Sequence, residues 1–327
     1  MRVAIPFQNM KGGSEKYTGA PYYAAMAALR TGADLATIFC AEEAANAIKT
    51  YSPELMVDSV YKAERMQSAE TRRSEVAEMV NRVSESMDRF HCIVIGPGLG
   101  RDEAVQDATA IIIKEARKRG ISIVLDADAL FLLSLSKYHD LIHCLQSPSE
   151  DELLDGSTVV LTPNVVEYKR LVNSIADGSE EKLRQILPGV IIVKKGHHDV
   201  IERFPTPSKS INKETSEEEK DVLTIDSTVM ICEEKGGLKR SGGIGDILAG
   251  SIGVFLSWNQ IMKNQNLETD AILSCWLASS LTKKATRVAF EKRRRSMTAP
   301  DILEEIGAVV DEVASSTIVE VQEDDEV

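Results

Sequence analysis

The chain has 327 residues, 43% of them apolar, which is enough to bury a substantial core. Its formal net charge of −13 argues against a general affinity for nucleic acid. The five cysteines are widely spaced and form no CxxC pair, which argues against a disulfide framework and a zinc site. No apolar run approaches the length of a membrane span, and the first residues lack a secretory or transit signal. We therefore expect a cytoplasmic protein that binds neither nucleic acid nor membrane, unless an N-terminal segment missing from the sequence directs it to the mitochondrion.

Short β-branched apolar runs alternate with longer amphipathic stretches along the first two thirds of the chain. The runs are continuously apolar, as strands covered on both faces should be: residues 34–40, 92–96, 121–127, 157–163 and 189–196. Between them, residues 68–88 and 101–120 have helical patterns. The repetition of strand, helix and strand predicts an α/β fold with a mostly parallel sheet between two layers of helices.

The pattern changes after residue 196. The run "HDVIE" follows the preceding strand at once, which predicts a β-hairpin, and residues 228–234 predict a further strand. Residues 204–221 contain two prolines and little to bury, so we expect a disordered insertion there. Helical patterns follow at residues 243–258, 268–290 and 299–314, and an acidic tail at 318–327. No linker divides the chain, so residues 1–317 are predicted to form a single domain.

Two segments with unusual residues follow predicted strands, and ligands bind beyond the carboxyl ends of parallel strands. In "IGPGLGRD" (95–102), the glycines would let the backbone approach a ligand and leave helix N–H groups free for an anion; a tight turn is the alternative. In "LDADAL" (125–130), Asp126 and Asp128 could hold Mg²⁺ through water or orient a hydroxyl. Alternatively, Asp128 caps the next helix, which its position favours.

Two further segments contain polar residues at strand ends. In "LTPNVVEYKRL" (161–171), Asn164 and Glu167 have the spacing of a capping box, and the same residues could face a metal-bound phosphate. In "KKGHHDV" (194–200), Lys195 could neutralise a phosphate and Asp199 could fix the turn. The two adjacent histidines should diverge in an extended segment, so we expect no metal site there.

The stretch "GGLKRSGGIGDILAG" (236–250) is the most specific segment of the chain. Glycines precede a predicted helix, so the amides from Gly242 to Asp246 would cluster at a helix N-terminus and bind an anion. Asp246 could take the proton of a hydroxyl that attacks a phosphoryl group, while Lys239 and Arg240 could clamp a polyphosphate. The alternative is that Asp246 only favours the helix start, an effect of about 0.5–1 kcal/mol. No Gly-Lys-Ser/Thr follows, so this is not a Walker A sequence.

The ordered set of motifs resembles a known family. "GGxGDxLxG" and "NxxE" are similar to the anion hole and the magnesium–phosphate motif of the ribokinase-like superfamily. Together with "EKYTGAPYYAAMAALRTGADLATIFC", "YSPELMV", "GPGLGRD", "LDADAL" and "KKGHHDV", they resemble the family of eukaryotic ATP-dependent (S)-NAD(P)H-hydrate dehydratases, from about Gly12 to Ala314. The resemblance implies a three-layer α/β/α ribokinase-like fold. It also implies an enzyme, a lyase that consumes ATP and dehydrates the S epimer of hydrated NADH or NADPH, with Mg²⁺ as cofactor.

The resemblance also implies the roles of individual residues. The catalytic base is Asp246, and the anion hole comprises Gly242, Gly243, Ile244 and Gly245. ATP is expected to contact Lys195, Gly196, His197, His198, Asp199, Gly236, Gly237, Leu238, Lys239, Arg240 and Ser241. The hydrated cofactor is expected to contact Gly96, Gly98, Gly100, Asn164, Val165, Val166, Glu167, Tyr168, Lys169, Arg170 and Asp246. Glu167 is expected to contact the metal through water. A homo-oligomer and a functional pairing with an NAD(P)HX epimerase are further expectations from the family.

One departure from the family pattern and one alternative enzyme stay open at this stage. In the family the first strand runs directly into a Gly-Gly turn, whereas here "PFQNMK" intervenes, and Pro6 is expected to disrupt a central strand. The alternative enzyme is a ribokinase-like small-molecule kinase that acts on a vitamin precursor of the hydroxyethylthiazole or hydroxymethylpyrimidine type. It would use the same Asp246 but leave the phosphate on its product.

Overall fold

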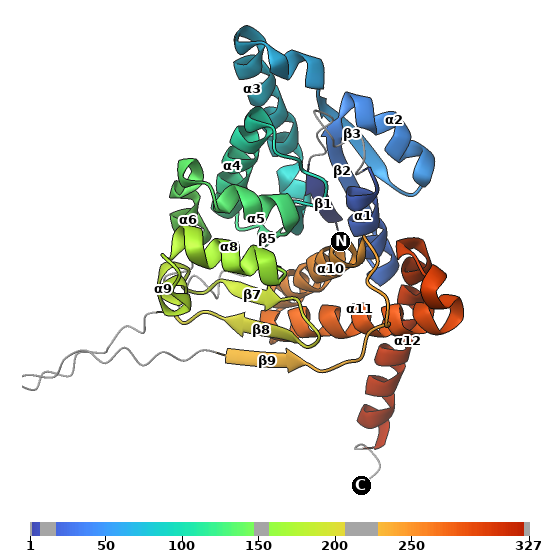
Figure 1. The fold of residues 1–327 in the computed structure, drawn as a ribbon. Helices are drawn as coiled ribbons and strands as arrows, with labels where there is room; N and C mark the ends of the chain where they lie inside the picture. The colour runs from blue at the N-terminus through green and yellow to red at the C-terminus, as the bar shows by residue number, and fades with distance from the viewer. Residues whose placement is uncertain (1, 7–17, 147–156, 207–227, 324–327) are drawn as a thin grey trace, which may run out of the picture.

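In the computed structural model, one twisted sheet runs through the whole protein (Figure 1). The model describes residues 2–6, 18–146, 157–206 and 228–323. The strands are β1 (Arg2–Pro6), β2 (Leu35–Ala41), β3 (Met56–Tyr61), β4 (Cys92–Ile95), β5 (Ser122–Leu125), β6 (Val159–Leu161), β7 (Ile191–Lys194), β8 (Asp199–Arg203) and β9 (Thr228–Cys232). Their order is β3-β2-β1-β4-β5-β6-β7-β8-β9. Neighbouring strands from β3 through β7 pair in parallel. β8 pairs antiparallel with β7, and β9 pairs antiparallel with β8, which confirms the predicted hairpin of β7 and β8.

Helices cover both faces of this sheet. One layer contains α1 (Gly19–Thr31), α2 (Glu42–Tyr51), α10 (Ile244–Asn264), α11 (Ala271–Arg293) and α12 (Ala299–Glu323). The other contains α3 (Ala69–Ser86), α4 (Glu103–Lys118), α5 (Ala127–Leu133), α6 (Asp140–Leu145), α8 (Val165–Ile175) and α9 (Glu180–Ile186). Ile93 and Ile95 of β4 belong to one core, and Cys92 and Val94 to the other. A strand buried on both faces is continuously apolar for this reason, and the predicted three-layer fold is confirmed.

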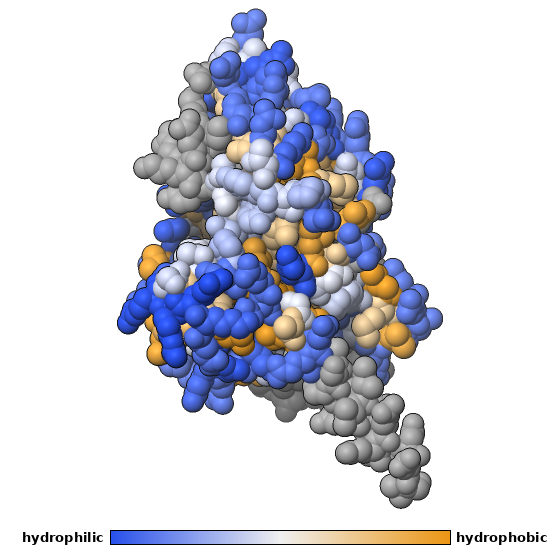
Figure 2. All heavy atoms as spheres, turned by 90° about the vertical axis from the view of Figure 1, so that its right-hand side faces the viewer, coloured by the Kyte–Doolittle hydropathy of each residue, from blue (hydrophilic) through white to orange (hydrophobic). Residues whose placement is uncertain are grey.

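The outer surface is mostly hydrophilic, as expected when most apolar side chains fill the two buried cores. Figure 2, which turns the right-hand side of Figure 1 toward the viewer, shows mostly hydrophilic side chains with hydrophobic patches among them. None of the helices in the described ranges is long and apolar enough to cross a membrane.

The strand order predicts a ligand site near β1 and β4. The chain proceeds outward from β1 to β2 and β3, then returns to β4 on the opposite side of β1. A crevice forms beyond the carboxyl ends of the strands where the winding reverses. The segments singled out in the sequence follow β4, β5, β6 and β7, so this topology gathers them along one edge of the sheet.

Pro6 does not disrupt the central strand, so that expectation was wrong. β1 pairs in parallel with both neighbours, and Pro6 is its last residue. The ladder with β4 involves only Val3 and Ala4, so it ends before the proline. A residue without an N–H group is tolerated at the end of a ladder because no bond is lost there.

Two predicted boundaries need correction. Phe204 is fully buried, its N–H donates to the Val190 carbonyl at 2.9 Å, and its carbonyl accepts from the Gly189 N–H at 3.0 Å. The predicted insertion therefore begins too early, because an aromatic side chain and two backbone bonds fix its first residue; residues 207–221 of it lie outside the described ranges. Helix α12 extends to Glu323, past the predicted start of the acidic tail at 318, and residues 324–327 lie outside the described ranges.

The last glycine of the 236–250 stretch has a packing role. A Cβ on Gly250 would lie 2.1 Å from the Ala24 carbonyl oxygen, because α10 crosses α1 there. We expect Gly250→Ala to lower the free energy of unfolding by about 1–3 kcal/mol, since the two helices must separate. Urea denaturation measures the change. Gly307→Ala is the matched control, because its Cβ would meet nothing within 4 Å and should stabilise helix α12. Equal effects of the two substitutions would contradict this role for Gly250.

Candidate active site

Residues 242–246 form a turn that leads directly into α10. Gly243 is the N-cap residue and has φ of +94°, a conformation that glycine adopts without steric cost. A Cβ there would lie 2.6 Å from the Ala299 Cβ, so no larger residue fits. The amides of Ile244, Gly245 and Asp246 have no partner inside the helix, and the N-cap has no side chain to satisfy them. Together with the positive end of the helix dipole, these amides make a site suited to an anion.

A buried ion pair lies beside this turn. Lys195, which follows β7, places its Nζ 2.6 Å from Oδ1 of Asp126, which follows β5 and is 2% exposed. A Cβ on Gly245 would lie 3.3 Å from the Lys195 Nζ and 3.8 Å from the Asp126 Oδ2, so glycine lets the backbone approach both charges. Burial opposes the charged form of Lys195, but the Asp126 carboxylate outweighs burial and raises the pKa of the ammonium group. The lysine therefore remains a cation beside the anion site.

Asp246 lies in the first turn of α10, within the field of this pair. Burial, and then the charge of Asp126, raises the pKa of Asp246 to about 7, while Lys195 opposes the shift. A general base is most effective when its pKa is near the operating pH. If Asp246 served only to stabilise the start of the helix, its partial burial beside the like charge of Asp126 would bring no benefit. The arrangement therefore favours the role of base over that of a helix-start residue.

The raised pKa of Asp246 implies a pH-dependent cost in stability. An unfolded aspartate ionises at about pH 4, whereas the folded group has a pKa of about 7. Between these values the folded state binds more protons than the unfolded state, so ionised Asp246 destabilises the fold increasingly as the pH rises. We expect Asp246→Asn to raise the midpoint of thermal unfolding at about pH 8, and to raise it less at about pH 5.

Differential scanning calorimetry at the two pH values measures this difference. Asp301→Asn provides a control of opposite sign, because the Thr298 backbone N–H lowers the pKa of Asp301 in the folded protein. That carboxylate stabilises the fold above its unfolded pKa and loses this contribution as the pH falls through its folded pKa. If Asp246→Asn destabilised the protein at both pH values, the burial of Asp246 as an anion would be contradicted.

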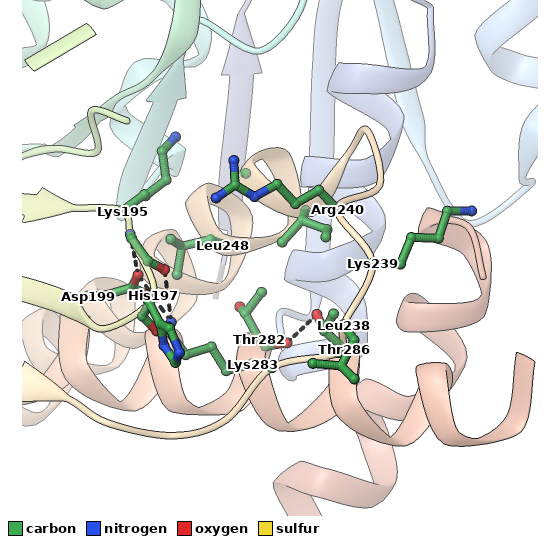
Figure 3. A pocket seen from close by; sticks show the side chains of 15 residues that line it. Lys195, His197, Asp199, Leu238, Lys239, Arg240, Leu248, Thr282, Lys283 and Thr286 are labelled. Atoms are coloured by element: carbon green, nitrogen blue, oxygen red, sulfur yellow. Dashed lines mark hydrogen bonds and ion pairs between the residues drawn. The ribbon is translucent and has the colours of Figure 1, made fainter. Parts of the chain in front are cut away.

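A cavity of about 400 Å³ opens on one side of the 242–246 turn. Figure 3 shows its walls: the turn between β7 and β8, the segment 236–240, and helix α11. The wall contains most residues predicted to contact ATP: Lys195, Gly196, His197, Asp199, Gly236, Gly237, Leu238, Lys239 and Arg240. His198 and Ser241 are not part of it. Ile244 and Gly245 form its inner end, so the cavity leads to the anion site.

The turn between β7 and β8 is held by two interactions. As predicted, Asp199 fixes the turn, since its Oδ1 accepts from the Gly196 N–H at 2.9 Å. Lys283 of α11 donates to the His197 carbonyl at 2.8 Å and lies 3.3 Å from Asp199 Oδ1. The histidine rings stack, with centroids 4.5 Å apart, so the expectation that they diverge was wrong: this segment is a turn rather than an extended strand. The described residues contain no group of three metal-ligating side chains there or elsewhere.

The two cations of "LKR" point in different directions in this structure. Lys239 donates to the Met297 carbonyl at 2.5 Å and points away from Lys195 in Figure 3. Arg240 instead points across the cavity toward Lys195 and Leu248. Both residues line the first cavity, so a clamp of a polyphosphate by the two remains a prediction.

The "GPGLG" turn is tied to β5 rather than open. A Cβ on Gly96 would lie 1.7 Å from the Asp126 carbonyl oxygen, so glycine is required there. Gly98 and Gly100 have positive φ values of 68° and 76°. The Gly100 N–H donates to Asp128 Oδ2 at 3.0 Å, so Asp128 fixes this turn and does not cap its own helix.

The amides that follow this turn are also occupied. Asp102 accepts from Ala104 N–H at 2.9 Å and from Val105 N–H at 3.4 Å. The expectation that the helix N–H groups remain free for an anion was therefore wrong. The glycines can still let a ligand approach the backbone, but α4 supplies no open anion site.

Asn164 and Glu167 form the predicted capping box. Asn164 Oδ1 accepts from the Val166 and Glu167 amides at 2.9 and 3.0 Å, and Glu167 Oε2 accepts from the Asn164 amide at 2.9 Å. Val165 and Val166 are 60% and 67% exposed, which leaves an apolar surface beside the cap. Tyr168 is buried instead, with its hydroxyl 3.1 Å from Glu180, so it supports the packing of α8 and α9. Lys169 is exposed, and the Arg170 guanidinium lies 5.5 Å from the Phe131 ring centroid.

The donor set fits Mg²⁺ only as an ion that arrives with a polyphosphate. Mg²⁺ is usually held by one or two carboxylates together with substrate phosphates and water. Glu167 uses Oε2 in the capping box, which leaves Oε1, and its charge acts on Lys195 at the anion site. The described side chains offer no complete metal cage. A single carboxylate contact, direct or through water, is therefore what Glu167 can supply.

A second cavity, of about 540 Å³, meets the other part of the 242–246 turn. Gly242, Gly243 and Asp246 line it, together with Tyr22, Tyr23 and Tyr51. The turn with the anion site and the carboxylate thus stands between two cavities. Transfer of a group between two ligands, one in each cavity, is the chemistry that this arrangement allows.

Sequence reasoning missed several residues of the two cavities. Leu248, Thr282, Lys283 and Thr286 line the first cavity, and the tyrosines line the second. The residues of α11 lie on a helix whose sequence has no unusual pattern, so no local signal could identify them. Tyr22 and Tyr23 could have been suspected from "YTGAPYY", where aromatic residues stand beside a helix start, whereas Tyr51 lies at the end of α2 with no such signal.

Comparisons with known proteins agree on one family. The model of the NAD(P)H-hydrate dehydratase family matches residues 10–308. An ATP-dependent (S)-NAD(P)H-hydrate dehydratase from Arabidopsis thaliana is 37% identical over 322 residues, covering 94% of this chain and 78% of the relative. The corresponding Homo sapiens protein is 35% identical over 309 residues, covering 91% of this chain and 75% of the relative.

Solved structures share the fold. A ribokinase-like superfamily protein from Enterococcus faecalis has a TM-score of 0.61 at 19% identity, covering 95% of this chain and 87% of its own. The ADP/ATP-dependent NAD(P)H-hydrate dehydratase from Bacillus subtilis, co-crystallised with ATP/Mg²⁺ and soaked with CoA, has a TM-score of 0.56 at 20% identity, covering 94% and 92%. The ribokinase-like fold is therefore shown by structure, and the family by sequence. This chain belongs to the NAD(P)H-hydrate dehydratase family.

Proposed function

We propose that this protein is an ATP-dependent dehydratase that converts the S epimer of hydrated NADH or NADPH back to NADH or NADPH, with release of ADP and phosphate. The observation that carries the proposal is the position of Asp246. Its carboxyl group, with a pKa of about 7, lies at the anion site between two cavities in a chain of this family. ATP would occupy the first cavity and direct its γ-phosphate to the 242–246 turn.

The first step would be a phosphoryl transfer. Hydroxide is a poor leaving group, so the hydroxyl at C6 of the hydrated nicotinamide ring must first be converted into a better one. Asp246 takes the proton of the C6 hydroxyl while the oxygen of that hydroxyl bonds to the γ-phosphorus of ATP. The bond from that phosphorus to ADP breaks in the same step. The amides of Ile244 and Gly245 and the Lys195 ammonium face the charge that develops on the phosphoryl oxygens. Mg²⁺ carried by ATP would supply further neutralisation of phosphate charge.

The second step would expel the phosphate. The lone pair of the ring nitrogen forms a C=N bond as the C6–O bond breaks and its electron pair leaves with phosphate. The departing phosphate then takes a proton from C5, the electron pair of that C–H bond forms the C5=C6 bond of the reduced ring, and the π pair of the C=N bond returns to the ring nitrogen. ATP is thus converted to ADP and phosphate, and the cofactor loses the elements of water.

A single incubation distinguishes this reaction from that of a kinase. Purified protein is mixed with ATP, Mg²⁺ and hydrated NADH, and the near-ultraviolet absorbance of the reduced nicotinamide is followed while phosphate is assayed. We expect the absorbance to recover with one phosphate released for each cofactor restored. ATP consumption with a stable phosphorylated product, and no recovery of absorbance, would contradict the proposal. Omission of ATP is the control and should abolish recovery of absorbance.

A further inference from the structure

Helix α11 supports two walls of the first cavity. One wall is the segment 236–240, and a Cβ on Gly237 would lie 2.6 Å from the Thr286 carbonyl oxygen and 2.7 Å from the Phe290 Cβ. This wall therefore packs directly on the helix. The other wall is the turn between β7 and β8, which the helix contacts through Lys283. The position of both walls thus depends on one helix.

Lys283 joins the two walls (Figure 3). Its Nζ donates to the His197 carbonyl at 2.8 Å and to the Gly196 carbonyl at 3.3 Å. The same Nζ lies 3.3 Å from Asp199 Oδ1, and the side chains of this ion pair are 12% and 7% exposed. Lower on the stem, the Lys283 Cγ lies 3.9 Å from the position of a Cβ on Gly236. One side chain therefore ties the turn to the segment on the other side.

The same contacts argue against a direct role of Lys283 in binding phosphate. Two backbone carbonyls accept from its ammonium group, which has only three N–H donors, and the Asp199 carboxylate neutralises its charge. The cation beside the anion site is Lys195 instead, 3.3 Å from the position of a Cβ on Gly245. Lys283 can thus influence a nucleotide through the walls that it holds.

We propose that Lys283 is a positioning residue for ATP, because it fixes the distance between the turn at 196–199 and the segment at 236–238. The inference rests on the proposed function in one respect, that ATP occupies the first cavity with its phosphates at the inner end. The nucleoside then lies between the two walls, near α11. A turn that is no longer tied to the helix holds the binding arrangement for less of the time, and the apparent affinity falls in proportion.

The first test is the substitution Lys283→Met, which keeps the stem and removes the ammonium group. The KM for ATP should rise about tenfold if the untied turn holds the binding arrangement for about a tenth of the time. The value of kcat should stay within about twofold, because a change in substrate binding alone alters KM and not kcat. The KM for hydrated NADH should not change, since the polar contacts of Lys283 lie in the walls of the first cavity.

Binding of adenosine separates a positioning role from a contact with phosphate. Displacement of a fluorescent ATP analogue measures the affinities of ATP and of adenosine, which has no phosphate. Lys283→Met should weaken both ligands by the same factor. A loss of affinity for ATP alone would show that Lys283 binds the phosphates, and unchanged affinities for both ligands would show that it does not hold the walls. Either result would overturn the proposal.

Two further variants control for effects on the fold. Lys284→Met removes an ammonium group from the next position of α11, where Nζ lies 2.6 Å from Glu312 Oε1 of α12 and outside the wall of the cavity. It should leave the KM for ATP unchanged, and a rise equal to that of Lys283→Met would overturn the proposal. Lys283→Gln keeps a donor for one carbonyl, so it serves if the methionine variant does not fold. Its KM for ATP should rise about threefold, from the partial loss of these contacts, and an unchanged KM would contradict the role.

Failure of this inference and failure of the proposed reaction give different results. If the wild type does not restore hydrated NADH, but Lys283→Met weakens ATP and adenosine equally, the positioning role stands and the reaction is wrong. If the wild type restores hydrated NADH, and Lys283→Met has an unchanged KM for ATP, the reaction stands and the positioning role is wrong.

Discussion

Replacement of Asp246 by asparagine should lower kcat for dehydration by about two to four orders of magnitude, which is what a positioned general base contributes. The asparagine keeps the size of the side chain and the amides of α10, so the affinity for ATP should change by less than about threefold, or 0.7 kcal/mol. Steady-state rates from the absorbance of the reduced nicotinamide, and calorimetric titration with ATP, measure the two quantities. Near-normal turnover would show that Asp246 only stabilises the start of α10.

The pH profile provides the control for this substitution. Because Asp246 acts as a base and its pKa is about 7, the wild-type kcat/KM should fall as the pH decreases through that value. The residual activity of Asp246→Asn should lack this acid limb. An acid limb that persists in the variant would assign it to a different group.

Replacement of Lys195 by methionine should damage both stability and activity. The substitution leaves the Asp126 carboxylate, 2% exposed and 2.6 Å from the former ammonium, without its partner. Breaking a buried ion pair from one side costs about 3–5 kcal/mol of unfolding free energy. Urea denaturation measures this loss. Turnover should also decrease, because a cation beside Gly245 is no longer present to face the phosphoryl charge.

The double variant Lys195→Met, Asp126→Asn separates these two effects. With both charges removed, no unpaired carboxylate remains, so most of the lost stability should return. Turnover should stay low, since the phosphoryl group still lacks its cation. If the double variant recovered activity along with stability, Lys195 would be a structural partner of Asp126 and not part of the chemistry.

The order of apolar and amphipathic segments in the sequence was sufficient to predict the class of fold. Strands such as β4 and β5 are buried on both faces, so their apolar runs are unbroken, and the glycine and proline residues around them fix their ends. The hairpin of β7 and β8 was also readable, because only a short turn separates the two runs. Boundaries were less accurate. Phe204 was assigned to the insertion because a single aromatic residue directly before two prolines gives no local sign that a core will receive it.

At the site, the sequence could name residues but could not decide their partners. Asp126 and Lys195 are far apart in the chain and meet only because β5 and β7 end at the same edge of the sheet, on either side of β6. The same holds for Asp128, which binds the Gly100 amide rather than its own helix, and for Lys239, which turns toward Met297. Hydrogen bonds between separate elements decided each of these cases.

The sequence by itself thus determined the parallel α/β architecture, and it predicted the glycine-rich turn as an anion site with Asp246 as its base, because each depends on local backbone requirements. Only the tertiary structure decided that Asp246 is partly buried beside a like charge, which raises its pKa to about 7. Only the packing of α1 against α10 and α2 brought three tyrosines to the second cavity. Burial and the charge of distant neighbours set the strength of a base, and neither is visible in the residues adjacent to it.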